Sequence, residues 1–121
     1  MIEMQKESAG FLKKALLIGI QEIGMPSSET SEHIAELSEL VRTLGFTESI
    51  EKLVCLKEIN PKYIVGSGKA AELANFAKEN SVDCVIFDHD LSPSQQRNWE
   101  ALTKLPVIDR QEVIIDIFAK R

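Results

Sequence analysis

The stretch DCVIFDHDLSPSQQRNWEALTKLPVIDR, residues 83–110, decides the expected fold. The apolar run at 82–87 is rich in β-favouring residues and is typical of a strand covered on both faces in a parallel sheet. Ser92 to Gln95 then provides an N-cap serine, a proline in the first helical turn and a glutamine that completes a capping box. A second apolar run at 106–108 ends at Asp109, which is spaced with Glu112 to start another helix. Two successive β-α units are therefore predicted, and each strand ends on an aspartate.

The rest of the chain repeats this alternation. Residues 15–20 and 53–56 are short apolar runs that predict two more buried strands. Apolar residues at helical spacing predict the core-facing sides of four helices, the first of which ends at a glycine cap at Gly45. These positions are Ile34, Leu37, Leu40, Val41 and Leu44; Ala70, Leu73, Phe76 and Ala77; Trp99 and Leu102; and Val113, Ile114, Ile117 and Phe118.

Four strand-helix alternations predict an α/β fold: a four-stranded, mostly parallel sheet with helices on both faces and strand order 2-1-3-4. With 121 residues and 44% apolar content, we expect one domain over 13–121. Residues 1–12 are polar and predict an irregular segment. No turn signal follows the last helix, so we expect a chain truncated from a longer polypeptide.

Charge and cysteine content narrow the function classes. The formal net charge is -5, which disfavours global attraction to nucleic acid or to an anionic membrane. Residues 1–60 carry ten acidic against six basic side chains, whereas residues 61–121 carry nine against eight, so a local basic face in the second half stays open. Cys55 and Cys84 fall in predicted strands and indicate reduced thiols in a cytoplasmic protein. No targeting or membrane segment is apparent.

Gly66, Ser67, Gly68 and Lys69 follow the second predicted strand and are the first candidate site. A phosphate loop would need a glycine where Tyr63 stands and a hydroxyl residue after the lysine, so that motif is absent. Free amides at a helix start, together with Lys69, could still hold a phosphate or another anion. The alternative is a tight turn that uses the backbone freedom of glycine.

Acidic residues at the strand ends are the second candidate. Asp88 and Asp90 could share a magnesium ion, with Glu22 as a third carboxylate, as in a Toprim-like phosphoryl-transfer domain. Asp88, Ser92, Gln95 and Asp109 serve equally well as helix caps and turn formers. We favour the interpretation that the acidic residues are helix caps and turn formers, so we assign no metal ligand and no catalytic residue.

Cationic and amide side chains in the second half are the third candidate. Arg97, Asn98 and Arg110 could contact phosphates or a partner protein. Trp99 lies among them, and its spacing with Leu102 favours a place in the core.

Three ordered motifs resemble one family. They are YIVGSGKAAEL at 63–73, VIFDHDLSPSQQRNWE at 85–100, and VIDR at 107–110 with IDIFAKR at 115–121. In sequence and spacing they are similar to the amino-terminal domain of the HflX-type GTPases. Trp99 departs from the leucine usual in that family, and residues 111–113 are less apolar.

The resemblance implies a regulatory domain of a translational GTPase that binds the large ribosomal subunit and its RNA and helps to split stalled or stressed ribosomes. GTP and magnesium would belong to a GTPase domain of the same polypeptide, outside this chain. This chain would be a monomeric, non-enzymatic domain that requires no cofactor. An ATP-binding role attached to some members would fit an ATP- or GTP-sensing site at Gly66–Lys69.

Overall fold

The computed structural model describes residues 13–119 and contains one four-stranded sheet in which every strand pairing is parallel. The strand order is β2-β1-β3-β4, which confirms the predicted α/β class and order. The elements in chain order are β1 (Lys14–Glu22), α2 (Ser27–Leu44), β2 (Glu48–Leu56), α3 (Ser67–Glu79), β3 (Cys84–Asp88), α4 (Pro93–Thr103), β4 (Val107–Asp109) and α5 (Arg110–Ala119).

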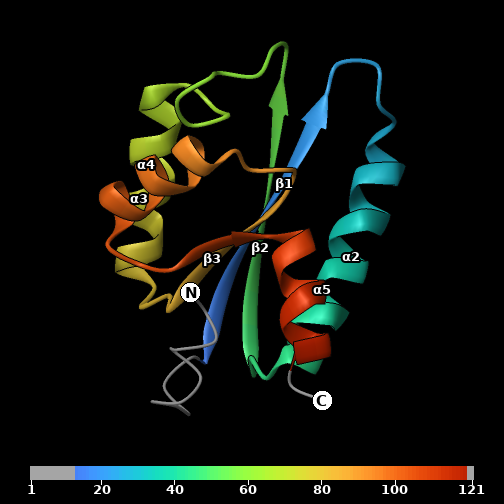
Figure 1. Cartoon of the computed structure of the whole chain (residues 1–121). Helices are drawn as coiled ribbons and strands as arrows, with labels where there is room; N and C mark the ends of the chain where they lie inside the picture. The colour runs from blue at the N-terminus through green and yellow to red at the C-terminus, as the bar shows by residue number, and fades with distance from the viewer. Residues whose placement is uncertain (1–12, 120–121) are drawn as a thin grey trace.

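The helices form two layers, one on each face of the sheet (Figure 1). Successive side chains of a strand point to opposite faces. Along β1, Leu16 and Ile18 therefore enter the core beneath α3 and α4, while Ala15 and Leu17 enter the core beneath α2 and α5. Both cores consist of apolar side chains, so the central strands β1 and β3 are buried on both faces, as their sequences predicted.

Trp99 is the largest fully buried side chain of the α3–α4 layer. Its ring makes edge contacts with Phe87 of β3 and with Tyr63, at centroid distances of 5.0 and 5.9 Å. The prediction that Trp99 belongs to the core is confirmed. A long aromatic side chain at this position ties α4 to the sheet and to the segment before α3.

The prediction of a short buried second strand was wrong in two respects. Strand β2 has nine residues instead of four, and only its Val54 is buried, because it lies at the edge of the sheet, where the predicted order places it. Cys55 is accordingly exposed, so it does not act as a buried hydrophobe. The error arises because an edge strand contacts a neighbour on one side only and tolerates the charged residues that made 48–52 look unlike a strand.

Several predicted core positions are less buried than expected, among them Leu40, Leu102 and Ile114, which are half-buried. On α5, Val113 is buried and Ile117 is half-buried, but Phe118 is 60% exposed and Asp116 is buried in its place. On α3, Phe76 is only half-buried, since it lies near the free edge of β2. Helical spacing gives the direction of each face, but the extent of the opposing layer decides how much of that face is covered.

The irregular segment predicted at 1–12 lies outside the described residues. Within 13–119, no helix is both long enough and apolar enough to span a membrane.

Candidate functional site at the carboxyl edge of the sheet

The carboxyl ends of parallel strands are where ligands of open α/β sheets usually bind. At the end of β3, Asp88 is held by Arg110, whose Nε donates to Oδ1 at 2.8 Å and whose Nη2 donates to Oδ2 at 3.3 Å. The same guanidinium donates to the His33 carbonyl of α2 and lies 3.7 Å from Glu36. Arg110 therefore joins α2, β3 and α5, and its charge is directed into the fold.

Asp109 organises the neighbouring loop. Its Oδ1 accepts the amide of Glu112 at 3.0 Å and caps α5, as predicted, while its Oδ2 accepts the amide of Leu91 at 3.1 Å. Ser92 and Gln95 form the predicted capping box, with each side chain accepting the other residue's amide. These residues are structural, because each oxygen is already used within the backbone framework.

The geometry does not favour the magnesium reading. Asp88 is committed to Arg110, Glu22 lies 3.7 Å from the ring of His89, and Asp90 is an exposed loop residue. Over the part of the chain that the structure describes, no three His, Cys, Asp or Glu side chains gather as a metal site would require. A cavity of about 390 Å³ lies beyond β1 and β2, and its lining is Gln21, Glu22, Ile23, Gly24, Cys55, Leu56 and Lys57.

The glycine-lysine segment starts α3. Gly66 is its N-cap and Ser67 its first residue, and no side chain caps the first amides. A Cβ atom on Gly66 or Gly68 would meet no atom within 4 Å, so neither glycine is required by close packing. The ammonium of Lys69 lies 3.3 Å from Glu72, one turn on, and so it is paired along the helix.

A loop from 57 to 66 connects β2 to α3, and α4 holds it in place. The side chains of Asn98 and Trp99 donate to the carbonyls of Lys62 and Tyr63 at 3.0 and 2.9 Å. Asn60 and Ile64 exchange two backbone hydrogen bonds across the turn, and Ile64 has a φ of 70°. A buried β-branched residue rarely adopts this conformation, so the contacts with α4 fix a loop shape that the local sequence alone would not choose.

The sequence placed Arg97, Asn98 and Arg110 in one group of candidates, and the structure separates them. Asn98 positions the 57–66 loop and Arg110 joins three elements, so both act inside the fold. Arg97 is exposed. Lys62 is the residue that sequence reasoning missed; the asparagine–proline pair before it marked a turn, but nothing local indicated that α4 would hold that turn.

The comparisons agree with this architecture. Residues 31–119 match the family described as "GTP-binding GTPase N-terminal". The chain is 39% identical over 116 residues to a GTPase HflX from Akkermansia muciniphila, covering 96% of this chain and 26% of that protein. It is 44% identical over 91 residues to the GTPase HflX of Escherichia coli K12, covering 74% of this chain and 21% of that protein.

Two solved structures share the fold. A GTP-binding protein from Sulfolobus solfataricus in complex with GDP has a TM-score of 0.64 at 19% identity, covering 88% of this chain and 30% of that one. A crystal structure of the G235S variant of SsGBP has a TM-score of 0.68 at 20% identity, with 88% and 32% covered. At this identity, the likeness shows the fold alone.

Fold and matches together define the class: an α/β domain of the kind that forms the amino-terminal part of GTP-binding proteins. The chain belongs to the GTP-binding GTPase N-terminal family and, within it, to the HflX-type proteins. It spans about a quarter of the length of the curated relatives named above.

Proposed function

We propose that this chain is the ribosome-binding, regulatory domain of an HflX-type GTPase that acts on the large ribosomal subunit and helps to split stalled or stressed ribosomes in the cytoplasm. The observation that carries the proposal is the match to HflX proteins over nearly the whole of this chain but only about a quarter of theirs. GTP hydrolysis, with its magnesium ion, belongs to the remaining part of such a protein.

The carboxyl edge supports a binding role rather than a catalytic one. Asp109 caps α5, Asp88 pairs with Arg110, Glu22 lies beside His89, and Asp90 is exposed in the loop, so these carboxylates are not arranged around a shared substrate position. The loop at 57–66 is instead hydrogen-bonded to α4, and its Lys62 is exposed. A loop whose backbone is already held by hydrogen bonds is suited to recognition, because less conformational entropy is lost when it binds.

The test is co-sedimentation of the complete HflX-type protein with large ribosomal subunits in the presence of a non-hydrolysable GTP analogue. The matched comparison is the same protein from which residues 13–119 have been removed. We expect the deletion to weaken subunit binding while the remaining part still binds GTP. Unchanged subunit binding after the deletion would overturn the proposal.

A nucleotide-sensing role for the Gly66–Lys69 segment is a second candidate. The open space around Gly66 and Gly68 and the uncapped start of α3 favour it. The pairing of Lys69 with Glu72 counts against it. Titration of the complete protein with ATP, comparing wild type with Lys69→Ala, tests this role; an identical ATP affinity of the two proteins would remove it.

A further inference from the structure

The two edges of the sheet differ in whether their backbone groups are covered. In β4, the N–H and C=O of Val107 point away from β3, because Val85 lies opposite Val107 but donates to the Pro106 carbonyl. Two side chains of α4 bind these groups: Gln96 donates to the Val107 carbonyl at 2.7 Å, and Glu100 accepts its amide at 3.5 Å. The β4 edge is therefore closed to another strand.

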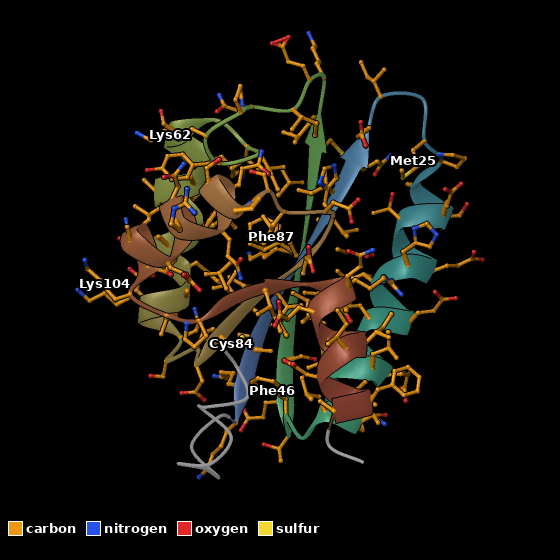
Figure 2. All side chains as sticks on the ribbon, viewed as in Figure 1. Met25, Phe46, Lys62, Cys84, Phe87 and Lys104 are labelled. Carbon is orange, nitrogen blue, oxygen red and sulfur yellow. The ribbon has the colours of Figure 1, made fainter. Side chains whose placement is uncertain are left out.

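The β2 edge is open. The Leu56 carbonyl accepts the amide of Ile23 at 3.2 Å, so the even-numbered residues of β2 direct their backbone groups to β1. The odd-numbered residues from 49 to 55 therefore direct theirs outward, and within residues 13–119 no hydrogen bond to these groups is seen. Phe46 and Lys62, which flank β2 in the sequence, lie at opposite ends of the molecule (Figure 2). The open edge thus extends along the sheet.

A groove lies beside this edge. A cavity of about 400 Å³ separates β2 from α3, and its apolar lining includes Val54, Leu73 and Phe76. The Lys52 ammonium lies 4.2 Å from the centre of the Phe76 ring. On the other face of the sheet, Leu53 is 46% exposed. An added strand would find hydrogen-bonding groups along the edge and apolar contacts on both faces.

The charges along β2 indicate which strand fits. Glu48 and Glu51 lie in its first half, and Lys57 follows its end. An antiparallel copy of β2 would set the acidic end against the basic end. With a two-fold axis at Val54, Glu51 of each copy faces Lys57 of the other, whereas an axis at Glu51 or Lys52 would place like charges opposite each other. Opposite charges that face each other across two strands stabilise the pair, and like charges destabilise it.

We propose that the β2 edge binds a second copy of this chain, whose own β2 pairs with it in antiparallel orientation about a two-fold axis at Val54. Leu53 then faces Cys55 of the second copy, so the exposed leucine of each chain enters the interface. The same axis reverses the direction of α3, so that Lys69 at the start of one helix lies toward Glu79 at the end of the other. The interface uses the same residues of both copies, as a two-fold dimer requires. The expectation of a monomer then holds only at low concentration.

The experiment measures the oligomeric state of the complete HflX-type protein, without ribosomes, by analytical ultracentrifugation between about 1 and 100 µM. The variants are Glu51→Lys, Lys57→Glu and the double exchange of both. The control variants Glu32→Lys and Lys104→Glu make the same changes in charge at exposed positions outside β2.

We expect a concentration-dependent equilibrium between monomer and dimer for the wild type. Each single variant sets like charges opposite each other twice and should weaken the dimer about 10-fold or more. The double exchange should restore the wild-type dissociation constant. An equal mixture of the two single variants should form a mixed dimer, since each then supplies the charge that the other lacks. The two control variants should match the wild type.

A protein that stays monomeric at every concentration overturns the proposal, whether the remaining part of the polypeptide covers the β2 edge or the edge stays free. A dimer that both single variants leave unchanged uses another surface and also overturns it. Single variants that weaken the dimer without rescue by the double exchange or the mixture contradict the facing of Glu51 and Lys57. Because no ribosome is present, none of these results bears on the ribosome-binding function.

Discussion

Arg110 holds Asp88 through two hydrogen bonds, from Nε at 2.8 Å and from Nη2 at 3.3 Å, and so fixes the start of α5 against the end of β3. Both side chains are largely shielded, with exposures of 27% and 11%. A partly buried, bidentate pair of this kind is worth more than a surface salt bridge, because water competes less for it.

Replacing Asp88 with asparagine should therefore destabilise the domain by about 1–3 kcal/mol, since the guanidinium keeps its place but loses its counter-charge. Urea unfolding measures the change. Glu36→Gln is the control, because Glu36 also faces Arg110 at 3.7 Å but is 68% exposed; its cost should stay below about 0.5 kcal/mol. Equal costs for the two substitutions would contradict the structural role given to Asp88.

Trp99→Phe should destabilise the domain by about 1–3 kcal/mol, because it removes the indole donor to the Tyr63 carbonyl and leaves a cavity in the α3–α4 core. Circular dichroism follows the unfolding, as the chain has one tryptophan and the variant has none. Ile23→Ala, at a side chain that is 73% exposed, is the control and should be close to neutral. A neutral Trp99→Phe would show that this hydrogen bond does not hold the 57–66 loop.

Glu112 gives a pH-dependent prediction. Desolvation raises its pKa above the ordinary value of 4.5, and the charges of Asp116 and Asp109 raise it further. The folded protein then keeps this proton to higher pH than the unfolded chain, so ionisation of Glu112 lowers stability as the pH rises above 4.5. Glu112→Gln should become more stable relative to wild type between about pH 4 and pH 7.

Thermal unfolding at several pH values measures this difference. The exposed residue Glu32 provides the control variant Glu32→Gln, whose difference from wild type should change little over the same range. A Glu112→Gln difference that is constant with pH would refute the assigned cause.

The two cysteines should differ in reactivity. Cys55 is exposed on the edge strand, whereas Cys84 is fully buried, and burial is the main cause that raises the pKa of its thiol. The thiolate is the reactive form. The Cys55 thiol should therefore react quickly with a maleimide in the native protein, and the Cys84 thiol should react only after unfolding. Cys55→Ser should leave the folded protein inert. Rapid labelling of that variant would contradict the burial of Cys84.

Local signals in the sequence predicted much of this architecture. The Ser92–Gln95 capping box and the Asp109 cap were readable because each operates over three residues. The parallel sheet followed from strand-helix alternation, which is a property of the whole pattern, and the suggested strand order 2-1-3-4 is confirmed. The length and the exposure of β2 were missed, because the apolar run at 53–56 does not show that charged residues before it pair in the same edge strand.

The candidate site was less predictable, because its contacts join distant residues. Asp88 and Arg110 are 22 positions apart, and Asn98 is 36 positions from Lys62. Spacing within a motif cannot show whether a cation points outward or is tied to a carbonyl. The sequence therefore predicted Arg110 as a binding residue, although its contacts are structural. It did not predict Lys62 as a candidate, because only the structure shows that α4 holds the loop that carries it.

The most direct test of the central claim is amide hydrogen exchange of the complete HflX-type protein, free and bound to large ribosomal subunits. We predict slower exchange in one or more peptides within residues 13–119 when the protein is bound, because these residues form the proposed ribosome-binding domain. No protection within residues 13–119 while the protein is bound would contradict the account.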